Sequence, residues 1–243
     1  MLDHAVANCA GVYRVWAERM GKRSRLWDDL SCADLELPVA LPPNIAVVLR
    51  EPTRDEADTL PQRAAEFFSE RTGGPYGVWS LWPLEGLPPD PLDHWRIPIM
   101  VRDVGGDAPV APAGLEIVEA TDASTVREAA ALIDESFEAQ SKPEDVLTID
   151  CLDDDFRVWV GRIDGRAVTT AAAYIGDGFV GLYAVATTPD ARGHGYGEAV
   201  TWAATLCRPE LPATLQASPM GRPIYDRMGY RTIAEFTVWD LER

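Results

Sequence analysis

The chain has 243 residues, of which 47% are hydrophobic and 25% charged, with a net charge of −17 and a sequence pI of about 4.5. This length suits two domains, and the composition is that of a soluble globular protein. The acidic balance argues against nucleic acid or an anionic membrane as the main partner, because both repel negative charge. It fits an amine substrate and, equally well, a solubilising surface.

The four cysteines are Cys9, Cys32, Cys151 and Cys207. They form no CxxC pair and no cluster with histidine, so we expect neither a zinc site nor a disulfide framework. Reduced thiols are typical of a cytosolic protein. Residues 1–23 do not resemble a signal peptide, and no apolar run reaches the roughly 18 residues of a membrane span. We therefore expect a cytoplasmic protein without a metal ion.

The first half of the chain gives a short succession of predicted elements. Ile45 to Arg50 is expected to be a strand, Asp55 to Glu70 a helix and Tyr76 to Trp82 a strand, followed by the apolar segment HWRIPIMV. The segment from Val104 to Gly114 is rich in Gly, Pro and Ala and is the best linker candidate. It predicts two domains, residues 1–112 and 113–243.

The second half shows clearer patterns. A helix capped by Thr121 or Asp122 is predicted to follow the first strand, with an apolar face that runs from Val126 to Phe137. Asp164-Gly165 and residues 176–178 are turn signals. The expected strands are 115–119, 156–162, 166–175, 179–186, 213–217 and 231–241, and two further helices are expected at 195–206 and 223–228. An antiparallel meander that continues as strand, loop, helix and strand predicts an α/β (α+β) fold with a mixed, mostly antiparallel sheet.

The two halves repeat an order of elements. Strand, helix and strand recur, and HWRIPIMV in the first half stands where GYRTIAEF stands in the second. The first half has no glycine-rich loop between its strand and its helix. We interpret it as a duplicated unit that lost its ligand loop, with chance similarity as the alternative.

That glycine-rich loop is Arg192-Gly193-His194-Gly195-Tyr196-Gly197, between a buried strand and a helix. Unpaired N–H groups and the helix dipole at such a place bind anions. Glycines let the backbone approach the ligand, and Arg192 adds a cation, so a pyrophosphate is the expected ligand. The loop lacks the Lys-Ser/Thr of a P-loop and the GxGxxG spacing of a dinucleotide site. A tight loop without a ligand is the remaining alternative.

The segment LYAVATTPDARGHGYG resembles the signature of the GNAT superfamily of N-acetyltransferases, in which loop amides hold the pyrophosphate of acetyl-coenzyme A. A second segment, LQASPMGRPIYDRMGYR, is similar to the family's strand-helix-YxxxGF block. Ser218 stands where many members carry asparagine. The resemblance covers about residues 115 to 241 and implies the GNAT fold. The first half resembles a degenerate copy, as in tandem members.

The resemblance implies an acetyl-CoA-dependent N-acetyltransferase. Tyr225 is the expected general acid, because a phenol of pKa about 10 can protonate a departing thiolate and stays neutral at pH 7. Backbone groups near Val185 are expected to bind the thioester oxygen. The expected coenzyme-binding residues are Ala184, Val185, Ala186, Arg192, Gly193, His194, Gly195, Tyr196, Gly197, Glu198 and Ser218.

The acceptor and the general base are less determined. Asp134-Glu135 lies where family members shape the acceptor site, whereas the acids at 150–155 are most simply a solvated face. Trp27 or Trp79 could line an acceptor pocket between the halves. We expect a small-molecule amine rather than a protein as the acceptor, and a homodimer as a candidate assembly. The alternatives are a non-catalytic acyl-CoA-binding module and an acyltransferase for longer acyl-CoA.

Overall fold

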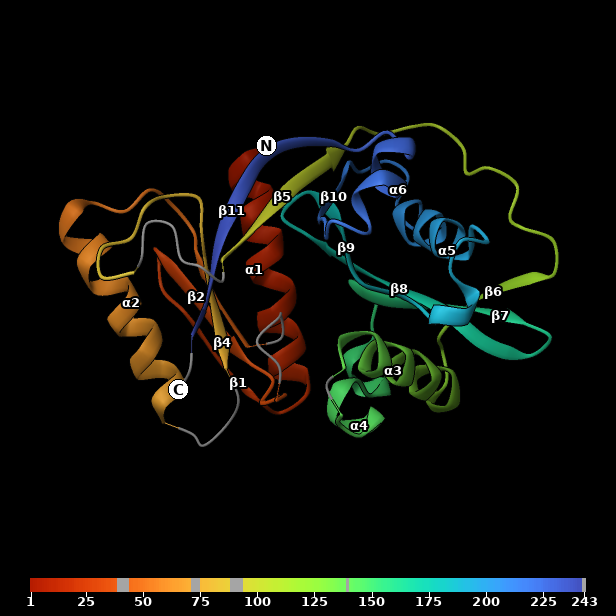
Figure 1. The fold of residues 1–243 in the computed structure, drawn as a ribbon, viewed down its shortest axis with the longest axis horizontal. Helices are drawn as coiled ribbons and strands as arrows, with labels where there is room; N and C mark the ends of the chain where they lie inside the picture. The colour runs from red at the N-terminus through yellow and green to blue at the C-terminus, as the bar shows by residue number, and fades with distance from the viewer. Residues whose placement is uncertain (39–43, 71–74, 88–93, 139, 242–243) are drawn as a thin grey trace.

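The structure of the chain, a computed structural model, describes residues 1–38, 44–70, 75–87, 94–138 and 140–241 (Figure 1). The elements of the first half are α1 (Leu2–Arg19), β1 (Arg23–Leu26), β2 (Leu30–Asp34), β3 (Asn44–Val48), α2 (Arg54–Ser69), β4 (Tyr76–Ser80) and β5 (His94–Arg102). Residues 103–114 contain no helix or strand and are almost all exposed.

The second half begins with an edge strand and a helix. Its elements are β6 (Leu115–Glu119), α3 (Ala123–Phe137), α4 (Pro143–Val146), η1 (Ile149–Cys151), β7 (Phe156–Ile163), β8 (Arg166–Gly176), β9 (Phe179–Thr187), η2 (Pro189–Ala191), α5 (Tyr196–Thr205), β10 (Ala213–Gln216), α6 (Arg222–Arg227) and β11 (Arg231–Leu241). Asp122 caps α3 through bonds to the amides of Ser124 and Thr125, as the sequence predicts. Asp164 and Gly165 both have positive φ, as a two-residue hairpin turn requires.

The described strands form one 11-stranded sheet in the order β1-β2-β3-β4-β11-β5-β10-β9-β8-β7-β6. Neighbouring strands are antiparallel except for two pairs, β3 with β4 and β9 with β10. The sheet is therefore mixed and mostly antiparallel, as expected.

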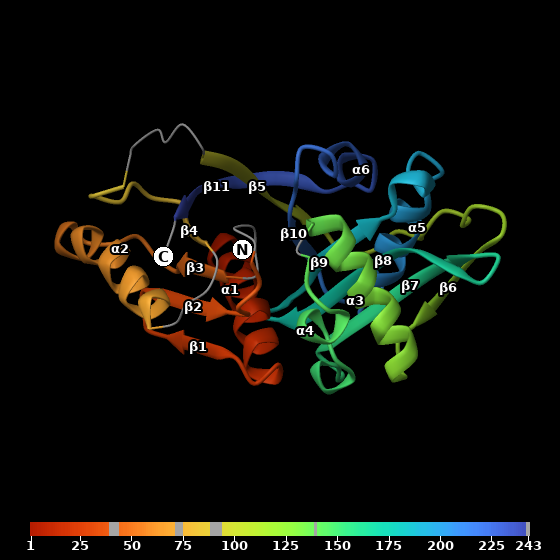
Figure 2. The ribbon, with the colours of Figure 1, turned by 60° about the horizontal axis from the view of Figure 1, so that its bottom comes forward.

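The last strand of each half is exchanged. β5 precedes the predicted boundary at 112/113 but lies between β10 and β11, while β11, at the end of the chain, pairs with β4 of the first half. Figure 2 shows β5 and β11 side by side, running from one half of the molecule to the other. The parallel pair β3–α2–β4 of the first half matches β9–α5–β10 of the second, so the two halves share a topology.

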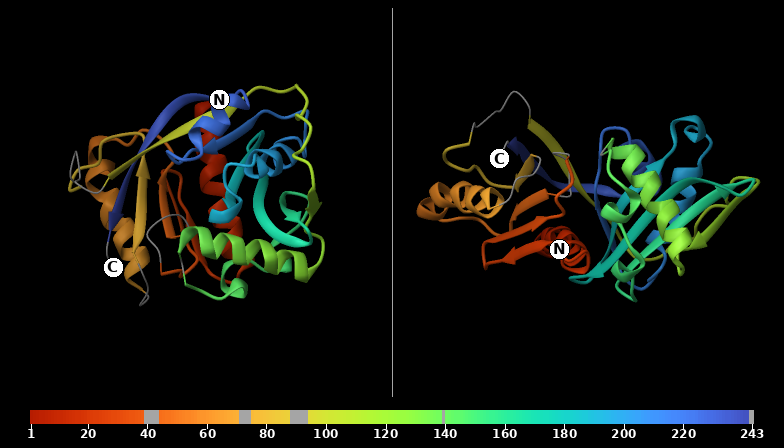
Figure 3. Two further views of the ribbon diagram at one scale, coloured as in Figure 1. Left: turned by 45° about the vertical axis from the view of Figure 1, so that its right-hand side comes forward. Right: turned by 90° about the horizontal axis from the view of Figure 1, so that it is seen from below.

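Helices cover both faces of the sheet. The side chains of α1 and α3 belong to one core cluster, which continues across both halves. On the opposite face, α2 covers the first half, and α5 with α6 covers the second. In the right-hand view of Figure 3, α1 is seen end-on beside the strands of the second half. A helix of the first half thus packs directly on β8 and β9.

The predicted helices and strands are all present, with ends that differ by at most two residues. Four elements were not predicted from the sequence, namely α1, β1, β2 and the short α4. In the part of the chain that the structure describes, the four cysteines carry free thiols. No described helix is both long and apolar enough to cross a membrane.

Candidate functional site

The parallel strands β9 and β10 separate in the middle of the sheet. Their pairing runs from Val180 with Ala213 to Leu182 with Leu215, and no described pair lies beyond it. β9 continues to Thr187 without this neighbour. On this side the backbone groups of β9 beyond Leu182 have no strand partner among the described residues, and we call this unpaired stretch between β9 and β10 the gap.

β9 is also distorted at this point. Across from β8, Ala172 pairs with Tyr183 but Thr170 pairs with Ala186, so two residues of β9 oppose one of β8. Ala184, inside this bulge, has φ +49, which is rare for a residue with a side chain. Such distortions gather at functional sites. The bulge turns Ala184 toward the core under α1 and α3, and Val185 toward the core under α5 and α6.

The glycine loop follows the free end of β9. Gly193 and Gly195 both have φ +81, and Gly195 precedes α5 with no side-chain cap on the first turn of the helix. A Cβ at Gly193 would meet open space, whereas a Cβ at Gly197 would lie 2.8 Å from the Thr187 hydroxyl oxygen. Glycine is therefore needed for backbone conformation at 193 and 195 and for close packing at 197. Among the described residues, no side chain caps the first amides of α5, and uncapped amides at a helix start favour anion binding.

Side chains of the loop lie at the surface. Arg192 is exposed and donates to the backbone oxygen of Thr187 (3.1 Å). His194 is exposed, bonds to the backbone oxygen of Arg192 and stacks on Tyr196. The carboxylate of Glu198 accepts a bond from Arg227 on α6 (2.8 Å), which joins the two helices beside the loop. Any contact from Glu198 to an anion would thus come from its backbone amide.

The equivalent helix of the first half is closed to anions. Thr53 and Glu56 form a capping box that occupies the first amides of α2. Asp55 and Glu56 also place negative charge in that first turn. The predicted loss of the ligand loop therefore comes with a helix start that repels phosphate.

Tyr225 and Ser218 lie beyond the gap, after β10. Tyr225 is 8% exposed and shares a core cluster with Val185, and burial raises its pKa to about 12. Its ring packs edge-on against Tyr230 (6.0 Å). Ser218 accepts a bond from the amide of Gly221 and so shapes the turn into α6. The structure thus places Val185 and Tyr225 in the same core cluster and gives Ser218 a local structural contact.

Other sequence candidates have structural roles. The carboxylate of Asp134 accepts a bond from the amide of Ser141, and Asp153 caps the turn before β7 and pairs with Arg19. The idea that Trp79 lines an acceptor pocket is wrong, because it is 2% exposed and packs on Phe236. Trp27 lies between the guanidinium groups of two arginines, Arg25 and Arg63, on the first half.

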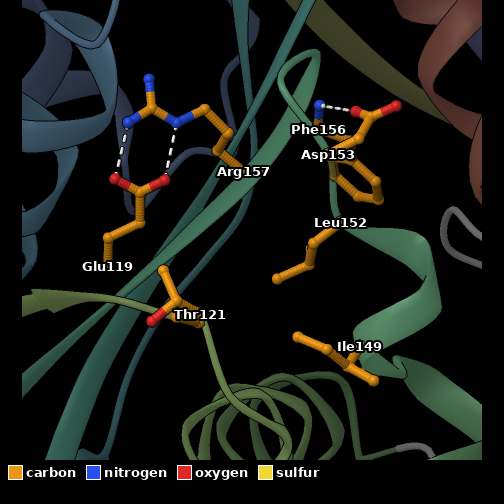
Figure 4. Close-up of a pocket in the computed structure, with 8 residues that line it drawn as sticks. Glu119, Thr121, Ile149, Leu152, Asp153, Phe156 and Arg157 are labelled. Carbon is orange, nitrogen blue, oxygen red and sulfur yellow. Dashed lines mark hydrogen bonds and ion pairs between the residues drawn. The ribbon is translucent and has the colours of Figure 1, made fainter.

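A cavity of about 240 Å³ opens beside the last residue of β6, Glu119, and the first residue of β7, Phe156 (Figure 4). Glu119 and Arg157 form a two-bond ion pair (2.7 and 2.6 Å) on one wall, and Ile149, Leu152 and Phe156 form the apolar side. Of the charged groups that line this cavity, Glu119 and Arg157 pair with each other and Asp153 pairs with Arg19. It lies two strands away from the bulge of β9.

Sequence reasoning missed the contact between α1 and β9. The Tyr183 hydroxyl donates to Asn8 Oδ1 (2.7 Å), and Asn8 Nδ2 donates to the Gly176 oxygen (2.7 Å). Asn8 is fully buried. The signal in the sequence was one asparagine on the apolar face of a helical pattern that repeats at Ala5, Cys9, Val12 and Trp16.

Residues 125–209 match the sequence model of the acetyltransferase (GNAT) family. Among solved structures, a GCN5-related N-acetyltransferase from Kribbella flavida has a TM-score of 0.66 at 20% identity, covering 96% of this chain and 95% of its own. A GCN5-related N-acetyltransferase from Sphaerobacter thermophilus (TM-score 0.52, 15% identity) covers 97% of this chain and 91% of its own. A tandem GNAT protein from the clavulanic acid biosynthesis pathway (TM-score 0.54, 15% identity) covers 88% of this chain and 77% of its own.

No curated protein matches the chain. The family match covers the glycine loop and the bulged strand, and the structural likeness extends over nearly the whole chain. Residues 125–209 are therefore similar in sequence to the acetyltransferase (GNAT) family, and the structural likeness shows that the chain has the GNAT fold.

Proposed function

We propose that the chain is an acetyl-CoA-dependent N-acetyltransferase that acts on the primary amine of a small molecule. The observation that carries this proposal is the uncapped, glycine-lined start of α5, directly after a strand whose bulge faces a gap in the sheet. The loop amides suit a diphosphate, and the free backbone of β9 suits the amides of a pantetheine arm.

Acetyl-CoA would supply the thioester that the amine attacks. The amides of Gly193, Gly195 and Gly197 bind its phosphates, and Arg192 adds charge pairing. The Val185 amide donates to the carbonyl oxygen as negative charge develops there. The Tyr225 hydroxyl donates its proton to the departing sulfur. Burial raises the pKa of Tyr225 to about 12, so the hydroxyl still carries its proton at neutral pH.

Binding of acetyl-CoA tests the loop. Excess acetyl-CoA should raise the Tm of the protein, since it binds only the folded state. The double variant Arg192→Ala/Gly195→Asp should lose this shift, because Asp at φ +81 brings strain, bulk and negative charge to the phosphate site. Arg25→Ala/Gly86→Asp is the matched control, because Arg25 is exposed and Gly86 also has positive φ with no atom near a Cβ. A Tm unchanged by millimolar acetyl-CoA contradicts the proposal.

Measuring turnover distinguishes the proposed acetyltransferase from a non-catalytic binding module and from an acyltransferase for longer acyl-CoA. Release of free thiol should require both acetyl-CoA and an amine from a panel of small primary amines. Coenzyme binding without thiol release would instead indicate a non-catalytic binding module. Faster turnover with butyryl-CoA than with acetyl-CoA would indicate an acyltransferase for longer chains.

A further inference from the structure

The side-chain amide of Gln216 is buried without a hydrogen-bond partner among the described residues. Both its nitrogen and its oxygen are shielded from solvent. An amide has two donors and an acceptor, and burying it unpaired costs folding free energy. Buried polar groups in native proteins are nearly always satisfied, so an unpaired amide next to a candidate site calls for a ligand.

Gln216 lies at the edge of the gap between the parallel strands. It is the last residue of β10, one position beyond Leu215, which pairs with Leu182. Its counterpart on β9 is therefore Tyr183, directly before the bulge at Ala184. The amide stands beside the backbone to which the proposed thioester binds.

The face of the sheet on which Gln216 lies is set by its neighbours. Gln216 is directly opposite Ile99 of β5, and Ile99 belongs to the core cluster under α1 and α3. Residues directly opposite in a sheet share a face. The glycine loop leads into α5, which packs on the other face with α6. Gln216 thus approaches the gap from the side opposite to the coenzyme helices.

Two other polar side chains on this face, those of Tyr183 and Asn8, are already engaged. The Tyr183 hydroxyl is bonded to Asn8, and Asn8 is bonded to the backbone of Gly176. The fit is close, because a Cβ on Gly181 would lie 1.9 Å from Asn8 Oδ1. α1 therefore forms a fixed wall, and Gln216 keeps its full hydrogen-bonding capacity.

We propose that Gln216 binds the acceptor: its side-chain oxygen accepts an N–H bond from a small, neutral primary amine and aims the nitrogen lone pair at the thioester. This inference rests on the proposed function. In the step, the amine nitrogen bonds to the acyl carbon and the carbon–sulfur bond breaks. The amine releases one proton to water, the sulfur takes one from Tyr225, and the Tyr225 phenolate regains a proton from water. The fixed wall of α1 restricts this side to slender amines.

The uncharged amide also suits the chemistry. A carboxylate at this position would stabilise the ammonium form, raise the pKa of the bound amine and remove its lone pair. Gln216→Glu should therefore shift the acidic limb of kcat/KM for the amine to higher pH. This change in pH profile would not follow from a structural role alone.

The test uses acetyl-CoA with n-propylamine, ethanolamine and benzylamine, on the full chain. Gln216→Leu should raise KM for the amines at least tenfold, while KM for acetyl-CoA and the Tm shift it causes stay the same. Gln62→Leu and Gln62→Glu, on the exposed face of α2, are the matched controls. Unchanged amine kinetics in Gln216→Leu would overturn the inference, and so would an increase in KM for acetyl-CoA alone.

Stability gives a second readout that needs no turnover. Since the amide is unpaired, Gln216→Leu without ligand should have a Tm equal to or above that of the wild type. A Tm well below that of Gln62→Leu would show that the amide is engaged in the fold and would overturn the inference. A wild type with neither a Tm shift by acetyl-CoA nor thiol release would refute the proposed function itself. If the wild type releases thiol and Gln216→Leu has the same KM for the amines, only the role of Gln216 is refuted.

Discussion

The phenol of Tyr225 keeps its proton throughout the pH range of ordinary assays, because burial raises its pKa to about 12. The neutral form is the one that can donate, and it is lost only as pH rises through that value. Tyr225 should therefore contribute no alkaline limb to the rate below about pH 11.

Tyr225→Phe removes this donor without changing the shape of the ring. We expect kcat to fall by about 10²–10⁴-fold, with KM for acetyl-CoA and the Tm shift similar to those of the wild type. Tyr230→Phe is the control, since that neighbouring buried hydroxyl is bonded to Thr205 and faces no proposed ligand. Equal kcat values for Tyr225→Phe and wild type would remove Tyr225 as the acid.

At the scale of elements, α1 is fitted to the acyl-binding strand through small residues. A Cβ at Gly181 would lie 1.9 Å from Asn8 Oδ1 and 2.5 Å from Cε2 of Tyr183, far inside normal contact distances. A Cβ at Gly11 on α1 would lie 3.0 Å from the Tyr174 hydroxyl oxygen, which is also tight but less so. The helix cannot move closer, and a larger residue would push it away from β9.

Gly181→Ala should therefore lower the Tm by roughly 2–12 °C, because overpacking in a tight core typically costs about 1–3 kcal/mol. Asn8→Ala alone should also destabilise, since it leaves the Tyr183 hydroxyl without its acceptor. The double variant should be more stable than the sum of the two changes, because Asn8→Ala removes one of the clashing groups. Thermal unfolding of the four proteins measures this coupling, and strict additivity would argue against the contact.

The elements of the second half could be predicted because local signals agree there. Caps, turn residues and alternating strands mark almost every end, as with Asp122 and with Asp164-Gly165. α1 was missed although its apolar spacing is regular, because Asn8 and Gly11 interrupt the pattern. Asn8 is explained by its bonds to Tyr183 and Gly176, and Gly11 by the nearby ring of Tyr174, all of which lie far away in the sequence.

The residues of the candidate site likewise divide into those that local motifs predict and those that depend on the tertiary fold. The glycine loop and Tyr225 follow from local motifs. The role of Gln216 could not be predicted, since it depends on which face of β10 the residue occupies and on where β9 and β10 part. The strand exchange could not be predicted either, because the sequence patterns of β5 and β11 do not specify which strands pair with them.

At the scale of the whole molecule, the exchanged strands make each half incomplete alone. Without β5, β10 loses its antiparallel neighbour, and without α1 the core under β8 and β9 is uncovered. Residues 113–243 expressed alone should therefore lack a cooperative thermal transition and should precipitate. Coexpression with residues 1–112 should restore a soluble complex that unfolds in one transition. A stable, cooperatively folding fragment 113–243 would show that the second half is self-sufficient.

The strand exchange also determines when the sheet can be completed during synthesis on the ribosome. β4 (Tyr76–Ser80) is synthesised long before its partner β11 (Arg231–Leu241). The edge of β4 stays unpaired until β11 has emerged, and an unpaired edge is a template for aggregation. Long-range pairing of this kind is also slow. Nascent chains that stall before β11 emerges are thus natural clients for chaperones, because the sheet closes only once β11 is available.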